Sequence, residues 1–363
     1  MRDRERIHYP SMEGVTQFTI YCTAITTYLI YKKMSIDHTN NFLLNCIFYD
    51  PNTLSIQCIQ SGLEQIKQNA DKNGLKVKEL NVETITSLKQ NKTTFNIALF
   101  NSLLKTNTFG RLLLYSPLIP SSQTLLKTHF DGIQNGLICI VDRQSQGKGR
   151  GGNVWESPHG CSMFSFKSVE TNGARLPFIQ YMISLAIIKA IKALPGGTDI
   201  DIGIKWPNDI YVNKTIKIGG VLCQSSSYNG VFDVTLGVGI NTTNDQPTVS
   251  LNSILRSNNK TIPELKREQV ISEILNQYEN MMDIFNVQGF KPFEDEYCKA
   301  WLHSNQRVQV VLRDGKDPID VTIKGISNVS GGLYSVDDDG NKYELYPDGN
   351  SFDFFKGLIR RKL

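Results

Sequence analysis

The sequence predicts an α+β fold in which a mixed β-sheet carries helices on one face and a small β-barrel follows. Three observations predict this fold. β-prone runs become dense from Arg111, two long helical patterns interrupt them, and after Trp301 short strands alternate with Asp/Gly turns. Strands and helices in this order imply a sheet domain with helices over one face. A stretch of about 60 residues with short, turn-separated strands is typical of a small barrel.

The predicted strands are runs of β-branched, aromatic and aliphatic residues between turn signals. In the main domain they are Arg111–Tyr115, Leu137–Val141, Met163–Phe166, Ile200–Lys205, Ile210–Val212, Ile216–Leu222 and Phe232–Val238. In the C-terminal region they are Arg307–Leu312, Asp320–Ile326, Leu333–Val336 and Lys342–Leu345.

Two long helices are predicted from apolar periodicity and boundary residues. In the first, Pro177 occupies a first-turn position, apolar residues run from Phe178 to Leu194, and Pro195-Gly196-Gly197 stops the helix. The second helix follows Pro263. Its apolar face comprises Ile271, Ile274, Leu275, Tyr278, Met282 and Phe285.

Residues 1–105 differ from the rest of the chain, being rich in Thr, Asn and Ile with few glycines. β-prone runs at Phe42–Tyr49 and Leu54–Ile59, with a capping-box pattern at 61–64, predict a small α/β piece. This piece lacks the three successive short helices of a helix-turn-helix reader. We predict three parts: an N-terminal extension over 1–105, a main domain over 106–304 and a C-terminal module over 305–363.

Composition excludes several classes of protein. The 363 residues are 40% hydrophobic and 20% charged, which is ordinary for globular domains. The formal net charge of +4 is spread thinly, without the dense basic stripe of a dedicated nucleic-acid binder. Seven scattered cysteines without a CxxC favour reduced thiols, and Phe18–Tyr31 is too short and Thr-rich to span a bilayer. We expect a cytoplasmic protein that binds neither nucleic acid nor a membrane.

The glycine-rich segment 144–155 is the first candidate site. Its four glycines let backbone N–H groups approach a ligand, and Lys148 and Arg150 place two cations among them. This arrangement favours a phosphate or carboxylate, and the alternative is a solvated glycine-rich hairpin. Three of the glycines match GxGxxG, but the following Val154-Trp155 and Pro158 do not open the helix that a dinucleotide motif requires.

The segment 205–209, Lys-Trp-Pro-Asn-Asp, is the second candidate. Pro207 and Asn208 imply a tight turn that would aim Lys205 and Asp209 at a common point. The alternative is a strand-ending turn in which Lys205 is solvated and Asp209 caps the backbone.

Two further glycine motifs lie in predicted strands, at 217–222 (Lys-Ile-Gly-Gly-Val-Leu) and at 237–241 (Gly-Val-Gly-Ile-Asn). Strand glycines mark close approach of a ligand or another backbone, and a β-bulge is the alternative for each.

His159 and Cys161 lack further ligands at metal spacing, and no Walker motif or hydrolase signature occurs. We therefore predict no dedicated protein cluster of metal ligands.

Jointly and in this order, the four motifs resemble those of biotin protein ligases, most closely the eukaryotic type called holocarboxylase synthetase. The likeness runs from about Phe95 to the C-terminus. It implies the class II synthetase-like biotin ligase fold, a mixed sheet with helices on one face, followed by an SH3-like barrel. It also implies a two-step reaction. Biotin and ATP, with Mg²⁺, form biotinyl-5′-AMP, and a lysine in the biotin carboxyl carrier domain of an apo-carboxylase then displaces AMP.

The resemblance also implies roles for individual residues. Those matching the catalytic cations are Lys205, Arg150 and Lys148. Those matching the biotin pocket are Ser121, Ser122, Gln123, Gln144, Lys148, Gly149, Arg150 and Lys205. Those matching the nucleotide side are Arg150, Asn153, Trp155, Asn208, Lys217, Gly239 and Asn241. For Asp209 the reaction itself suggests a role, which is to orient Lys205, to bind Mg²⁺ or to help the incoming lysine lose its proton.

The chain departs from the family's motifs at a few positions. Ser121-Ser122-Gln123 stands where many members have Ser-Thr-Asn, and bacterial members carry Arg where this chain has Lys148 and Asn153. The second departure implies a less cationic nucleotide loop. Nothing in the chain resembles the bacterial DNA-binding domain.

Two other functions stay open on the sequence. A lipoate–protein ligase uses the same adenylation logic, but the glycine segment and the Lys-Trp-Pro-Asn-Asp motif argue against it. A non-catalytic biotin-binding or carrier-docking protein would not need both Lys205 and Arg150.

Overall fold

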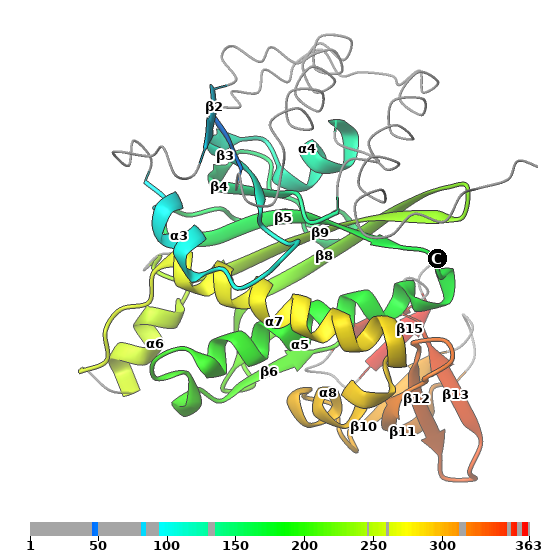
Figure 1. Cartoon of the computed structure of the whole chain (residues 1–363). Coiled ribbons are helices and arrows are strands. Elements are labelled where there is room, and N and C mark those ends of the chain that lie inside the picture. Colours follow the sequence, from blue (N-terminus) through cyan, green and yellow to red (C-terminus); the bar gives the residue numbers. More distant parts are fainter. Residues whose placement is uncertain are drawn as a thin grey trace, which may run out of the picture.

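The computed structural model describes residues 46–49, 81–84, 94–129, 135–244, 247–258, 261–311, 317–346, 350–353 and 358–361. Within these residues the chain forms a nine-stranded sheet layered with helices and a six-stranded sheet nearer the C-terminus (Figure 1). The predicted strand Leu54–Ile59 and the predicted helix after Ser61 lie outside the described residues.

The nine-stranded sheet runs in the order β2-β1-β3-β4-β5-β9-β8-β7-β6. Its strands are β1 (Cys46–Tyr49), β2 (Asn81–Thr84), β3 (Leu112–Ile119), β4 (Ile138–Gln144), β5 (Cys161–Glu170), β6 (Ile202–Lys205), β7 (Asp209–Val212), β8 (Ile216–Tyr228) and β9 (Val231–Asn241). β3 and β4 pair in parallel, whereas the pairs from β4–β5 to β6–β7 are antiparallel. The prediction of a mixed sheet is confirmed.

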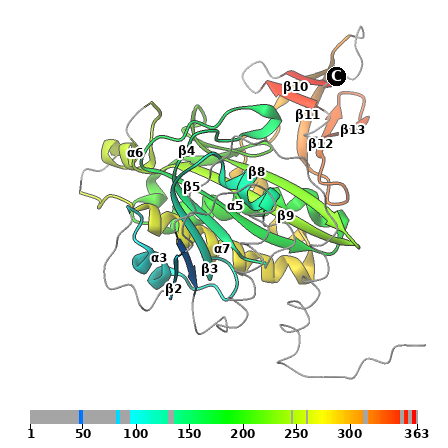
Figure 2. The same cartoon turned by 90° about the horizontal axis from the view of Figure 1, so that it is seen from above.

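Both long helices are present, as α5 (Leu176–Ala193) and α7 (Arg267–Gln288), and they cover one face of the sheet (Figures 1 and 2). The short helix α4 (Ser122–His129) lies on the opposite face. Alternation along β5 separates the two layers, because successive side chains of a strand point to opposite faces. Phe166 packs edge-to-face on Tyr278 of α7, whereas the Ser165 hydroxyl lies 2.8 Å from that of Ser122 in α4.

Helix α5 is apolar on most of its circumference because it packs on the sheet and also contacts the neighbouring helices α7 and α8 (Glu294–Ala300). By length and composition alone, the segment Gly173–Ala193 could cross a membrane. However, 67% of its most apolar stretch is buried within the fold, and α5 contacts α7, α8, β6 and β8. Packing against the sheet and against neighbouring helices therefore accounts for its composition.

The described strands of the N-terminal extension belong to the main sheet. β1 pairs antiparallel with β3, with Cys46 opposite Tyr115, and β2 pairs with β1. The segment that enters β3 is held against α7, where the Glu279 carboxylate accepts the N–H groups of Thr108 (3.0 Å) and Phe109 (2.9 Å). Helix α3 (Ile97–Leu103) packs on α7 within this segment. The domain limits at 105 and 305 stay predictions.

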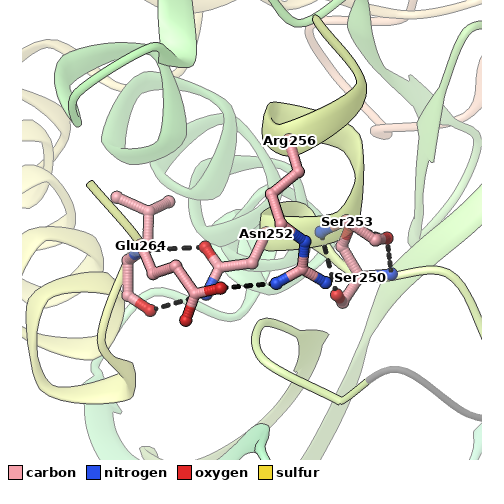
Figure 3. Close-up of polar contacts among 6 residues, drawn as sticks. Ser250, Asn252, Ser253, Arg256 and Glu264 are labelled. Carbon is pink, nitrogen blue, oxygen red and sulfur yellow. Dashed lines mark hydrogen bonds and ion pairs between the residues drawn. The ribbon is translucent and has the colours of Figure 1, made fainter. Parts of the chain in front are cut away.

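The connection from α6 (Leu251–Asn258) to α7 is fixed by polar contacts (Figure 3). Asn252 binds the backbone of Leu265 twice, accepting its N–H at 2.9 Å and donating to its carbonyl at 3.0 Å. An ion pair between Arg256 and Glu264 lies beside it. These contacts set where α7 begins.

The C-terminal sheet has the order β13-β12-β11-β10-β15-β14. Its strands are β10 (Arg307–Val311), β11 (Ile319–Ile326), β12 (Leu333–Asp337), β13 (Lys342–Leu345), β14 (Asn350–Asp353) and β15 (Leu358–Arg361). Val308, Val310, Val321 and Ile323 alternate with more exposed neighbours and form its buried face. The described strands make a barrel-like sheet that is not closed, since β13 and β14 are its two edges.

The segment joining the two sheets follows α8 (Glu294–Ala300) and runs beside β6. The N–H of Leu302 donates to the Ile204 carbonyl at 2.9 Å. The ring of His303 is fully buried, and its Nε2 accepts the N–H of Trp206 at 2.9 Å. The second sheet is thereby attached at the edge of the first.

The burial of His303 predicts a pH-dependent stability. Burial lowers the pKa of its ring from 6.5 to about 4. The folded protein therefore binds this proton less tightly than the unfolded chain, so the stabilisation is complete above about pH 6.5 and is lost as the pH falls towards 4. At ~1.4 kcal/mol per pKa unit, it amounts to about 3 kcal/mol. Urea unfolding at about pH 7 and about pH 4.5 should show a steeper loss in wild type than in His303→Gln. Equal losses in the two proteins would contradict this.

Candidate active site

The glycine-rich segment forms a hairpin after β4. The N–H of Trp155 donates to the Gly147 carbonyl at 2.9 Å, and that of Gly149 donates to the Asn153 carbonyl at 2.7 Å. Gly151 turns the chain with φ +67°, a conformation that favours glycine. The backbone of this segment therefore forms the hairpin of the alternative interpretation. The hairpin is nevertheless one wall of a cleft.

This cleft has a volume of about 390 Å³ and opens on the face of the sheet that carries α4. Its size is typical of small-molecule sites, roughly 300–1,000 Å³. All predicted site residues except Asn241 line it. They are Ser121, Ser122, Gln123, Gln144, Lys148, Gly149, Arg150, Asn153, Trp155, Lys205, Asn208, Asp209, Lys217 and Gly239.

Glycines on neighbouring strands form the floor of the cleft. Gly239 of β9 is paired with Gly220 of β8, and Gly237 lies two residues away along β9, so these three positions contribute no side chain to the floor. A Cβ at Gly239 would come within 2.5 Å of the Trp155 ring, and one at Gly237 within 2.6 Å of the Gln123 side-chain oxygen. Glycine is required here by the close approach of two side chains, whereas the sequence predicted the approach of a ligand or another backbone.

The motif at 217–222 contains the bulge that was its alternative interpretation. Ile210 pairs with Gly219 and Tyr211 pairs with Lys217, which leaves Ile218 as an extra residue in β8. A bulge bends its strand and re-aims the neighbouring side chains. Lys217 projects into the cleft as a result of this local geometry.

The turn after β6 brings Lys205 and Asp209 to the same cleft. These two residues are paired across the β6–β7 ladder, and the Lys205 ammonium lies 5.4 Å from the centre of the Tyr211 ring. The Asp209 carboxylate forms an ion pair with Lys217 at 2.8 Å. The sequence reasoning did not identify this pair, although opposite charges flanking a short hairpin turn would have been a usable signal.

Asn208 holds the turn against β8. Its side-chain amide donates to the Val221 carbonyl at 2.7 Å, and its own carbonyl accepts the Val221 N–H at 2.9 Å. These two bonds fix the direction in which the flanking Lys205 and Asp209 leave the sheet. Asn208 lines the cleft, but its side-chain nitrogen already donates to the carbonyl of Val221 in β8.

Asn241 is the predicted site residue that the structure does not bring to the cleft. It is buried at the end of β9, opposite Cys161, whose thiol contacts its Oδ1 at 3.7 Å. The chain entering β5 covers this strand end, since Thr243 donates its N–H to the Gly160 carbonyl at 3.0 Å. The motif therefore reaches the cleft through Gly237, Val238 and Gly239.

Uncharged polar groups gather where α4 begins. Gln144 accepts both the N–H (2.8 Å) and the hydroxyl (3.2 Å) of Ser122 through its Oε1. The Ser165 hydroxyl joins them, and nothing in the local sequence singled it out. The sequence feature that could have identified Ser165 is the alternation of side chains along β5. Ser165 points to the opposite face of the sheet from Phe164 and Phe166.

Gln123 presents a buried acceptor to the cleft. Its Nε2 donates to the carbonyls of Thr235 (3.0 Å) and Leu222 (3.3 Å), which fixes the orientation of the amide. Its Oε1 is buried and has no hydrogen-bond partner among the described residues. An unpaired buried acceptor costs about 1–3 kcal/mol, so this oxygen is suited to a ligand N–H group.

The other end of the cleft is cationic. Four of its lining residues carry positive charge, and Asp209 is the one carboxylate among them. The cations are Lys148, Arg150, Lys205 and Lys217. Trp155 lies between the hairpin and the floor, with the Lys217 ammonium 5.9 Å from its ring centre. This end suits a polyanion with an aromatic or planar group attached.

No metal centre is evident in the described part of the chain, where no three His, Cys, Asp or Glu residues form a group that could hold an ion. Cys139, Cys161, Cys223 and Cys298 are free thiols. Burial raises the pKa of the Cys161 thiol to about 12, which removes it as a nucleophile at neutral pH.

Comparison with known proteins identifies relatives of this chain. The Biotin/lipoate A/B protein ligase family matches residues 115–241. The chain is 40% identical over 337 residues to Biotin–protein ligase 1, chloroplastic, of Arabidopsis thaliana, covering 89% of this chain and 91% of that protein. It is 34% identical over 282 residues to the Homo sapiens Biotin–protein ligase, covering 74% of this chain and 38% of the human protein.

The fold is also similar to solved structures. The biotin protein ligase from Aquifex aeolicus in complex with biotin and ATP matches with a TM-score of 0.51 at 23% identity, covering 69% of this chain and 99% of that one. A point mutant of the same protein in complex with biotin matches with a TM-score of 0.53, also at 23% identity, covering 69% of this chain and 98% of that one.

The contact between Gly239 and Trp155 predicts the effect of one methyl group. Gly239→Ala places a Cβ within 2.5 Å of the Trp155 ring, so the ring must move out of its position on the floor. Overpacking of this kind costs roughly 1–3 kcal/mol. We expect lower stability in urea and a higher acrylamide quenching of tryptophan fluorescence. Gly325→Ala is the control, since nothing lies within 4 Å of its Cβ. Unchanged quenching in Gly239→Ala would contradict the contact.

Proposed function

This chain belongs to the biotin–protein ligases, and we propose that its cleft performs both steps of biotin ligation. In the first step, an oxygen of the biotin carboxylate attacks the α-phosphorus of ATP, which yields biotinyl-5′-AMP and expels pyrophosphate. In the second step, the amine of a carrier lysine attacks the acyl carbon. An amide bond forms, AMP leaves and the amine loses a proton.

The observation that carries the proposal is the division of one cleft into an uncharged end and a cationic end. Gln123 lies against Gly237, whereas Trp155 lies against Gly239 and Asp209 lies near Gly220. Biotin has a neutral ureido head and an anionic tail, and ATP adds a polyphosphate. A ligand of this shape would place its head by α4 and its carboxylate towards the cations.

The uncharged end has the hydrogen-bonding groups that a cyclic urea needs. The unpaired Oε1 of Gln123 would accept a ureido N–H. The hydroxyls of Ser122 and Ser165, which lie 2.8 Å apart, can turn to donate to the ureido oxygen. The replacement of the family's common Asn by Gln123 thus keeps an acceptor in this position.

The cationic end supplies what the first step requires. A carboxylate and a phosphate repel each other, so the site must hold positive charge where negative charge builds in the transition state. Lys205 would bridge the biotin carboxylate and the α-phosphate. Lys148 and Arg150 would hold the phosphates from the hairpin. Trp155 would cover the adenylate and exclude water from a hydrolysable intermediate.

We propose that Mg²⁺ enters the cleft bound to the phosphates of the nucleotide. Mg²⁺ is commonly bound by substrate phosphates with one or two carboxylates, and Asp209 is the carboxylate among the cleft's described residues. When bound with ATP, the ion would neutralise charge on the phosphates. Since Asp209 already pairs with Lys217, its own acid/base role stays a prediction.

The carrier and the cellular location also belong to the proposal. We infer that the acceptor lysine lies in the biotin carboxyl carrier domain of apo-carboxylases, because the relatives are biotin–protein ligases. The free thiols of the described residues support a reducing compartment such as the cytoplasm. Neither nucleic acid nor a membrane is needed for this reaction.

The proposed function is tested by the first half-reaction. We expect the protein to release pyrophosphate from ATP when biotin is added, and to label an apo carrier domain afterwards. Lipoate should support neither reaction, because the cyclic urea is what meets Gln123 and the serines. Pyrophosphate release with lipoate alone would make the protein a lipoate ligase. Biotin binding without any pyrophosphate release would make it a non-catalytic binding protein.

Substitution of Lys205 tests the mechanism. Lys205→Ala removes the cation at the reacting atoms, so adenylation should slow by on the order of 10²–10³-fold. The affinity for biotin should change far less, because the ureido contacts remain. Lys214→Ala is the matched control, as this lysine is exposed in the β7–β8 turn outside the cleft. An adenylation rate within about twofold of wild type would remove Lys205 from the mechanism.

A further inference from the structure

The peptide that follows Lys205 is held by groups outside its own hairpin. The N–H of Trp206 donates to Nε2 of His303 at 2.9 Å. The backbone of the same joining segment pairs with β6, where the N–H of Leu302 donates to the Ile204 carbonyl at 2.9 Å. The chain that leads into the C-terminal sheet therefore contacts β6 on both sides of Lys205.

The His303 ring is fixed in one tautomer. Its Nε2 accepts from a backbone N–H, so the proton of the neutral ring resides on Nδ1, which lies 2.9 Å from Oε1 of Gln306. The ring is fully buried, and burial lowers its pKa to about 4. At neutral pH the ring is uncharged and keeps its lone pair on Nε2.

Other contacts hold the same turn. The indole N–H of Trp206 donates to the Tyr181 hydroxyl at 3.0 Å, and that hydroxyl donates to the Gly331 carbonyl at 2.6 Å. Gln180 donates to the Pro207 carbonyl at 3.1 Å. Gly331 lies between β11 and β12, so the turn is held by α5, by the joining segment and by the C-terminal sheet.

We propose that His303 is a positioning residue for Lys205, through which the joining segment sets the rate of adenylation. The inference rests on the proposed function. The Lys205 ammonium can stabilise the transition state only if it lies where negative charge develops. Lys205 directly precedes Trp206, whose N–H is bound by His303. A displacement of about 1 Å at a reacting group can cost on the order of 10²-fold in rate.

Two isosteric substitutions separate the hydrogen bond from packing. In His303→Gln the side-chain oxygen can occupy the place of Nε2 and accept the Trp206 N–H. In His303→Asn the oxygen corresponds to Nδ1 and does not reach it. Both substitutions are uncharged and polar. We expect the kcat of biotin-dependent pyrophosphate release to fall about 10- to 100-fold in His303→Asn and at most about threefold in His303→Gln.

The control and a second readout exclude a general effect on the joining segment. Ser304→Ala removes two neighbouring contacts, from the Trp301 indole at 2.7 Å and to the Cys298 carbonyl at 2.9 Å, without touching the turn. It should keep the wild-type kcat. Biotin affinity, measured by calorimetry, should be unchanged in all three variants, because the ureido contacts lie at the other end of the cleft.

Each outcome decides the proposal. A kcat loss in His303→Asn with recovery in His303→Gln supports it. Equal losses in both His303 variants, or a loss in Ser304→Ala as large as in His303→Asn, would overturn it in favour of packing. A wild-type kcat in His303→Asn would also overturn it. If wild type itself releases no pyrophosphate with biotin, the proposed function fails instead, which the same assay distinguishes.

Discussion

The alternation of side chains across β5 and β9 is the constraint on which the rest of this structure depends. On one face, Phe166 and Leu236 are paired across the strands and are buried beneath α5 and α7. On the other face, Ser165 is paired with Gly237 and Met163 with Gly239, so β9 contributes no side chain at these two positions. The same two strands thus provide the apolar core and the floor of the cleft. Large residues on the first face stabilise the sheet, and small residues on the second leave room for a ligand.

The cleft collects its positive charge from separate parts of the chain. Lys148 and Arg150 come from the hairpin after β4, Lys205 from the end of β6 and Lys217 from the bulged part of β8. The total charge of +4 over 363 residues gave no indication of this concentration. Like charges held together in the folded state repel one another, which is unfavourable unless an anion is present. The pair formed by Asp209 and Lys217 offsets part of that repulsion before a ligand arrives.

Much of the fold and the cationic end of the cleft were predictable from local patterns, whereas Ser121, Ser122 and Gln123 followed only from the family resemblance. α5 and α7 follow from apolar periodicity, and the turn at 205–209 follows from its proline and asparagine. What the sequence did not reveal depends on pairing between distant segments. The outer half of β8 is polar, so the predicted strand ended at Leu222, whereas β8 continues to the Asn229-Gly230 turn that joins it to β9. Asn241 looked like part of a ligand motif, but the chain entering β5 covers it. The Asn-Gly turn is a local sign of the first pairing, but a single sequence contains no local sign of the contact that covers Asn241.

The predicted boundary between the main domain and the C-terminal module lies at residue 304, next to the contacts that join them. A boundary in a flexible linker would be crossed by few contacts. Here the joining segment extends the β6 edge through Leu302, and His303 binds the backbone of the turn between β6 and β7. Tyr181 adds a contact from α5 to the C-terminal sheet. Because Leu302 binds the carbonyl of Ile204 and His303 binds the N–H of Trp206, the joining segment holds the backbone on both sides of Lys205 at the cationic end of the cleft. The C-terminal sheet is therefore a support of the cleft as well as a separate β-module.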